Sequence, residues 1–171
     1  MELSATKKGL ITGVIMILIS FGIYYAKGNF DNSLQYITYC TYVAGIIWTI
    51  LSFAKQNKGA SKFGTYFSQG FKCFIVVTLL MVIFTAGFLY LHPEYKDQMA
   101  GIYKEQMTKG GNTTPAEIEE RLKLAKKTFT MAMIMATVLS YLAIGAMISA
   151  ITSAFLMQKN KYAAQSQASV K

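Results

Sequence analysis

Four long stretches of this sequence contain no Asp, Glu, Lys or Arg, and they constrain the fold more than any other feature. They are Gly9–Ala26, Asn32–Ala54, Cys73–Pro93 and Thr128–Gln158, with 18, 23, 21 and 31 residues. A helix rises about 1.5 Å per residue, so about 20 apolar residues cross a hydrocarbon core of about 30 Å. Each stretch approaches or exceeds that length. The sequence therefore predicts a single all-α domain, an integral membrane four-helix bundle.

The predicted spans cover residues 9–27, 33–54, 70–92 and 127–157. Charged residues return between the last two spans, where an external helical hairpin is predicted over residues 93–127. Pro93 favours a break after His92, and Gly110–Asn112 favours a turn. Thr114, Pro115 and Glu117 then form a capping-box signature for a new helix that continues into the fourth span. Residues 162–171, rich in Ala, Gln and Ser, are predicted to be a disordered tail.

The net charge of +9 is distributed unevenly and predicts an orientation. The N-terminus, the link 55–72 and the tail from Lys159 carry eight of the nine excess positive charges. Basic residues concentrate on cytoplasmic loops of membrane proteins. We therefore expect both termini in the cytoplasm and the lipid bilayer as the partner of these lysines. Nucleic-acid binding is not expected.

Small and hydroxylated residues recur at helical spacing within the spans and predict helix packing. Such residues let two membrane helices approach closely. The first span has Gly9 and Gly13, and the fourth has the row Gly145, Ser149 and Ser153. In the second span Gly45 lies on one face with three hydroxylated residues, which we expect to point into the bundle: Thr38, Tyr42 and Thr49. The serine row indicates either the centre of the bundle or the seam of an oligomer.

A second set of residues is predicted to lie at the membrane interfaces. Phe63, Phe67 and Phe71 recur every four residues in the link before the third span, where they predict a short amphipathic helix at the inner interface. Lys72 follows, and its long side chain can reach the headgroups. His92 lies at the outer end of the third span and is interpreted as a cap or interfacial donor.

The spans offer little chemistry for catalysis or ion coupling. The four uncharged stretches contain no Asp, Glu, Lys or Arg, and their one His is His92 at the end of the third. Buried ionisable groups are what proton relays and coupled transport use. Cys40 and Cys73 are predicted at different depths, too far apart for a disulfide. Composition therefore predicts that the protein is not an enzyme and has no cofactor, metal site or catalytic residue.

The chain resembles a bacterial four-span family catalogued as domain of unknown function 4199. The resemblance rests on the Gly64-x-x-Phe67-x-x-Gly70-Phe71-Lys72 entry to span three, His92-Pro93-Glu94, the Thr-Pro-Ala-Glu restart and the small-residue fourth helix. It covers about residues 5–158 and implies a bacterial inner membrane, but no activity. Because family members are often encoded near membrane glycosyltransferases, it also implies an envelope setting.

Three functions remain open from the sequence. The leading hypothesis is a non-catalytic scaffold or accessory subunit that associates with itself as a homo-oligomer or with another envelope membrane protein, for which a membrane glycosyltransferase is one candidate. The alternative is an oligomeric small transporter or channel subunit, since four spans with little polar lining form a poor conduit alone. A membrane enzyme acting on lipid-linked substrates is the weakest of the three.

Overall fold

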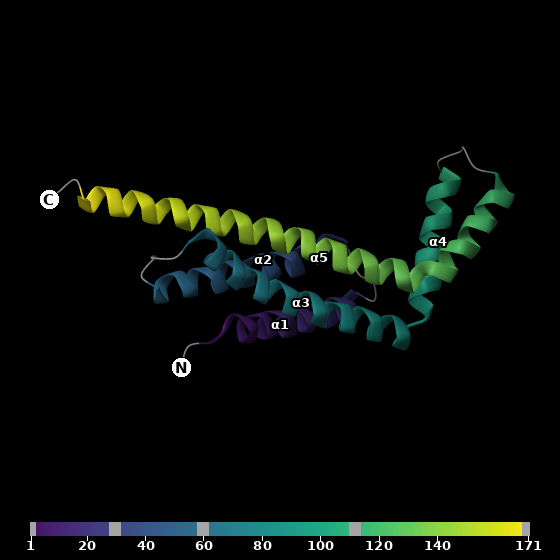
Figure 1. The fold of residues 1–171 in the computed structure, drawn as a ribbon. Helices are drawn as coiled ribbons and strands as arrows, with labels where there is room; N and C mark the ends of the chain where they lie inside the picture. Colours follow the sequence, from purple (N-terminus) through teal and green to yellow (C-terminus); the bar gives the residue numbers. More distant parts are fainter. Residues whose placement is uncertain (1–2, 28–31, 58–61, 110–113, 169–171) are drawn as a thin grey trace. The chain divides into compact units, whose positions relative to one another are not determined.

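The computed structural model describes residues 3–27, 32–57, 62–109 and 114–168, and all regular structure in these ranges is helical (Figure 1). The helices are α1 (Ala5–Lys27), α2 (Asn32–Gln56), α3 (Phe63–Leu91), α4 (Glu94–Lys109) and α5 (Pro115–Ala168). The predicted turn at Gly110–Asn112 lies outside the described residues.

Four of the helices are long and apolar enough to cross a membrane. The candidate spans are Ala5–Ala26, Tyr36–Gln56, Phe63–Leu91 and Pro115–Asn160. The predicted all-α fold with four spans is therefore confirmed. Large apolar side chains such as Leu18, Ile83 and Ile151 are more than half exposed in the chain alone, as expected for helices whose solvent is lipid.

Two helices extend further than the sequence predicts. The aromatic segment at residues 63–71 and the third span form one helix, α3, without a break at Gly70. Helix α5 continues to Ala168, where a disordered tail was expected from residue 162. Alanine and glutamine are good helix formers, and adding residues to an existing helix avoids the unfavourable nucleation step. Residues 169–171 lie outside the described part.

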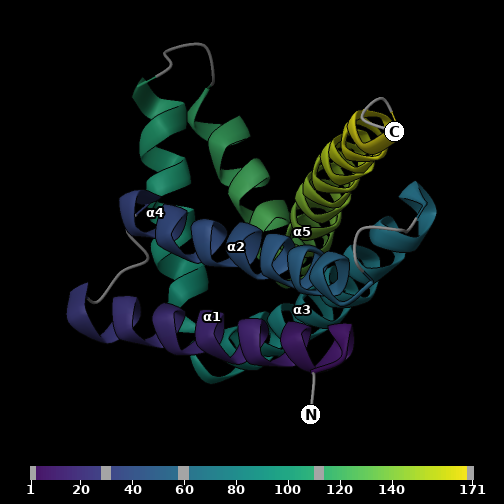
Figure 2. The same cartoon turned by 90° about the vertical axis from the view of Figure 1, so that its left-hand side faces the viewer.

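The chain divides into two compact units, and α3 and α5 contribute to both. One unit comprises Met1–Met81 with Leu139–Lys171, and the other comprises Val82–Val138. We call the first the bundle unit and the second the hairpin unit. Figure 2 shows α1 and α2 running side by side in the bundle unit.

Close approach of helices in the bundle unit occurs at glycines. A β-carbon on Gly9 would lie 2.7 Å from the carbonyl oxygen of Cys73, and one on Gly13 would lie 2.6 Å from Leu80 Cδ1, so both glycines face α3. Gly45 of α2 meets Thr12 of α1. Without a hydrophobic force between helices in lipid, such close packing is a main source of association.

The remaining small residues of the bundle unit join α5 to its neighbours. Gly145 lies against Tyr42 and Phe74, with the position of its missing β-carbon 2.7 Å from Phe74 Cγ. Gly70 of α3 lies against Ile50 and against Ser149 of α5. Gly70 therefore does not end a helix, because its lack of a side chain serves helix contact instead. Gly145 and Ser149 of the predicted serine row therefore contact other helices of the same chain.

Gly9→Ala is predicted to lower the free energy of unfolding by about 1–3 kcal/mol, the usual cost of overpacking a well-packed site. The new methyl group would meet the backbone of Cys73, which cannot move as a flexible side chain does. Gly22→Ala in the same helix is the matched control, because nothing lies within 4 Å of that position. The control should be neutral or stabilising by up to about 1 kcal/mol. Unfolding in mixed micelles measures both, and equal effects would contradict the packing described for α1.

Candidate functional site

Hydroxyl and thiol groups meet inside the bundle unit. Tyr42 donates a 2.8 Å hydrogen bond to the carbonyl oxygen of Tyr141, and their rings pack edge to face at 5.1 Å. Thr49 Oγ1 donates to the Gly45 carbonyl at 2.8 Å and lies 3.4 Å from Cys73 Sγ. The prediction that the hydroxylated face of the second span points into the bundle is thereby confirmed, since Thr38, Tyr42 and Thr49 are all buried.

Two hydroxyls in this interior differ from the others. Ser149 and Ser153 are fully buried, and within the described ranges their Oγ atoms have no hydrogen-bond partner. The two cysteines are free, as predicted, with Cys40 exposed and Cys73 buried. In the described part of the chain no group of three His, Cys, Asp or Glu residues is arranged to hold a metal ion.

A buried lysine in the bundle unit was not foreseen from the sequence. Lys8 was assigned to the exposed basic N-terminus, yet it is only 5% exposed, and its Nζ lies 5.5 Å from the centre of the Trp48 ring. A cation over an indole face is attracted by the ring quadrupole. No carboxylate in the described residues pairs with Lys8. A tryptophan 40 positions away gives no local signal, so sequence reasoning could not find this contact.

The predicted interfacial residues of the link form a ladder of rings along α3. The ring centres of Phe63 and Phe67 are 5.9 Å apart, and those of Phe67 and Phe71 are 6.3 Å apart. Lys72 follows on the same helix and is exposed. Tyr66, on another face, is fully buried and accepts a 3.1 Å hydrogen bond from Asn160 Nδ2. Helix α3 therefore has an outer face with the three phenylalanine rings and another face, at Tyr66, that packs on α5.

Within the hairpin unit, α3 ends at Leu91, at the predicted break. His92 Nδ1 lies 2.8 Å from Glu94 Oε1, and the His92 ring packs on Phe88 with 4.6 Å between ring centres. A hydrogen bond from the backbone amide of Glu94, and then the one from His92, lower the pKa of the Glu94 carboxyl. His92 therefore helps to fix the first turn of α4, in keeping with its interpretation as a cap.

The predicted capping box at the start of α5 is confirmed. The Glu117 carboxylate accepts hydrogen bonds of 3.0 Å from both the backbone N–H and the hydroxyl of Thr114. In return, the Glu117 N–H donates to Thr114 Oγ1 at 3.4 Å. The box satisfies polar groups that a helix start otherwise leaves without partners.

An ion pair joins the two arms of the hairpin. Lys126 Nζ of α5 donates a 2.7 Å hydrogen bond to Asp97 Oδ1 of α4. That hydrogen bond, together with the positive charge of Lys126, holds the pKa of the Asp97 carboxyl below its ordinary value. Close to this pair, the rings of Tyr95 and Phe129 lie 6.3 Å apart. The arms are thus connected by one polar and one aromatic contact.

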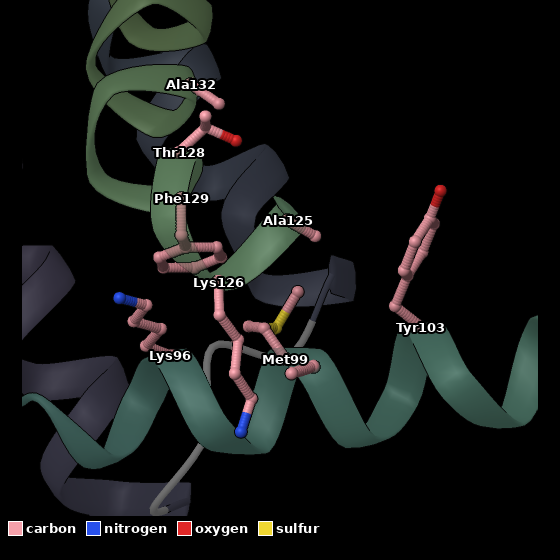
Figure 3. A pocket seen from close by; sticks show the side chains of 9 residues that line it. Lys96, Met99, Tyr103, Ala125, Lys126, Thr128, Phe129 and Ala132 are labelled. Carbon is pink, nitrogen blue, oxygen red and sulfur yellow. The ribbon is translucent and has the colours of Figure 1, made fainter. Parts of the chain in front are cut away.

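Two pockets lie beside these contacts, both within the hairpin unit. The first, of about 280 Å³, is lined from α4 by Lys96, Met99, Ala100 and Tyr103. Its α5 side is formed by Ala125, Lys126, Thr128, Phe129 and Ala132. Figure 3 shows Met99 and Phe129 extending into the space between the two helices. Because three of the lining residues are alanines, the inner faces of the arms leave this space unfilled.

The second pocket, of about 360 Å³, is also lined by Phe129. Its walls include Ala86, Leu89 and Tyr90 from the end of α3, with Pro93 and Thr130. Lys96 and Phe129 line both pockets. The sequence predicted this hairpin but not the pockets, because they depend on how two arms of similar length face each other.

The fold and its four candidate spans define a multi-pass α-helical membrane protein. Residues 7–158 match the family described as Protein of unknown function (DUF4199), and the chain belongs to this family. The predicted resemblance is thereby confirmed. Neither the curated proteins nor the solved structures include a match to the chain.

Lys126→Gln is predicted to raise the pKa of the Asp97 carboxyl towards its ordinary value, because the hydrogen bond and charge that lower it are removed. A depressed carboxyl pKa stabilises the hairpin above the unfolded pKa, and this contribution is lost as the pH falls through the lower folded value. Carboxyl chemical shifts followed by NMR from pH 6 downwards measure the change. Lys109→Gln is the control, because Lys109 pairs with Glu105 within α4. An unchanged Asp97 pKa in the Lys126 variant would contradict the ion pair.

Proposed function

We propose that the chain is a non-catalytic scaffold or accessory subunit of a bacterial envelope complex. The observation that carries this proposal is the hairpin unit, whose arms are fixed by their own capping box, ion pair and aromatic contact. A surface fixed in advance binds a partner at a lower entropic cost than a loop that must order on binding. The hairpin therefore suits recognition of another protein.

The exposed apolar residues of α4 indicate where such a partner would bind. Ile102 is 49% exposed and Tyr103 is 44% exposed, on a helix whose other exposed positions are mostly polar or charged. Tyrosine in particular is enriched at protein interfaces. We place the contact with another envelope membrane protein on this part of α4.

A role for α5 in membrane association supports the same proposal. Its residues Leu139, Met147, Ile151 and Phe155 are each more than half exposed along one side of the bundle unit. Since Gly145, Ser149 and Ser153 are already packed within the chain, this apolar side is the surface of α5 that remains for lipid or for a neighbouring helix. A second copy of the chain is the other partner that it would accept.

Ile102→Lys is predicted to reduce co-purification of the partner in mild detergent at least tenfold, while Gln98→Lys on the same helix leaves it unchanged. Both variants add the same charge at exposed positions, but only the first replaces an apolar contact. A photo-crosslinking residue at position 102 should give one defined protein adduct in cells. A chain that purifies alone as a monomer, with no adduct at position 102, would overturn the scaffold proposal.

The alternative, a small transporter or channel subunit, is favoured by one observation, the buried unpaired hydroxyls of Ser149 and Ser153. Hydroxyls of this kind line polar paths through membrane proteins. Vesicles reconstituted with the purified chain distinguish the two functions. The scaffold proposal predicts no solute flux above that of protein-free vesicles. Flux that Ser149→Ala and Ser153→Ala reduce would establish the alternative instead.

We also propose that the protein lies in the bacterial cytoplasmic membrane with both termini in the cytoplasm, on the strength of the lysines in alternate links. A fluorescent reporter that matures only in the cytoplasm is expected to be active when fused after Lys171. The same reporter inserted between residues 110 and 112 should be inactive. The reverse pattern would invert the orientation.

A further inference from the structure

The two pockets of the hairpin unit share one cation and one aromatic ring. Phe129 and Lys96 each line both of them. The Tyr95 ring, 6.3 Å away, helps to hold Phe129 in this position. Two largely apolar spaces therefore meet at a single positive charge.

Lys96 is the cation in these pockets that is available to a ligand. Lys126, which lines the first pocket, is hydrogen-bonded to Asp97 at 2.7 Å. Across the part of the chain that the structure describes, Lys96 forms no salt bridge, although its positive charge also helps to lower the pKa of the Asp97 carboxyl. Residues 94–97 and 123–127, at the base of the hairpin, contain four lysines, Lys96, Lys123, Lys126 and Lys127, and two carboxylates, Glu94 and Asp97. The excess positive charge of this region therefore favours the binding of an anion.

The residues that line the pockets come from both the uncharged blocks and the charged hairpin segment of the sequence. Ala86, Leu89 and Tyr90 belong to the uncharged block Cys73–Pro93, and Phe129 and Ala132 belong to the block Thr128–Gln158. The second pocket therefore has apolar walls from the end of α3, whereas the first lies mainly between the hairpin arms, with Phe129 and Ala132 on its α5 side. Lys96, three residues beyond the block Cys73–Pro93, places a cation in both.

We infer that this site binds one anionic phospholipid, with its phosphate at Lys96 and one acyl chain in each of the two pockets that Phe129 lines. A diacyl phospholipid has one phosphate and two chains, which corresponds to the shared lysine and the two pockets. Volumes of about 280 and 360 Å³ accommodate part of each chain. The inference does not depend on the scaffold proposal, although Tyr103, which lines the first pocket, also belongs to the surface proposed for the partner.

Binding of phosphatidylglycerol to the purified full-length chain, measured by native mass spectrometry, tests this site. Lys96→Gln is expected to weaken binding about fivefold, the effect of one lysine near an anionic surface. Lys96→Arg should retain the affinity. Lys104→Gln, at an exposed position of α4 that lines neither pocket, should leave it unchanged. Equal binding by the Lys96→Gln variant and the unmodified chain would overturn the inference.

A second pair of variants tests the apolar walls without altering charge. Ala132→Phe fills the first pocket and is expected to weaken binding, whereas Ala143→Phe, at an exposed position of α5 outside both pockets, should not. Phosphatidylcholine, which has the same chains and no net charge, should bind more weakly than phosphatidylglycerol. Glycerol phosphate without chains should not displace the lipid. Equal binding of the two lipids, or displacement by glycerol phosphate, would contradict a site for an anionic phospholipid.

Discussion

Close contact between helices at small residues is the interaction on which the bundle unit depends. Lipid removes the hydrophobic force that would otherwise drive helices together, so packing and hydrogen bonds between helices must hold them. Gly9 and Gly13 bring α1 to α3, Gly45 brings α2 to α1, and Gly70 and Gly145 join α3 and α5. Tyr42, against which Gly145 lies, donates its hydrogen bond to the Tyr141 carbonyl of α5. Three buried threonine hydroxyls donate instead to carbonyls one turn earlier in their own helices.

The elements of the structure that the sequence predicts are those that depend on local chemistry. Uncharged length identifies the four spans, Pro93 marks the break after α3, and Thr114 with Glu117 marks the start of α5. The inward face of α2 was also predictable, because a hydroxyl in lipid needs a partner and so disfavours the outer surface. Each of these signals is local, because it consists of residues within or directly beside the feature that it predicts.

What could not be predicted depends on which helices are neighbours. Gly70 gives no sign in the sequence that Ser149 lies against it, and Lys8 gives none that its Nζ lies 5.5 Å from the centre of the Trp48 ring. Small residues show that one side of a membrane helix packs, but they do not show which helix packs against it. The pockets around Phe129 are harder still, since they are spaces between arms. Their only signal in the sequence is the group of alanines on the facing sides.

The unbroken course of α5 has a consequence for its backbone. No proline follows Pro115 in its 54 residues, so no interior position lacks the N–H that donates to the carbonyl oxygen four residues earlier. An unpaired backbone group is costly inside a hydrocarbon core. An uninterrupted helix therefore allows one segment to start in charged sequence at Pro115 and to continue through the uncharged block Thr128–Gln158 with its backbone groups paired.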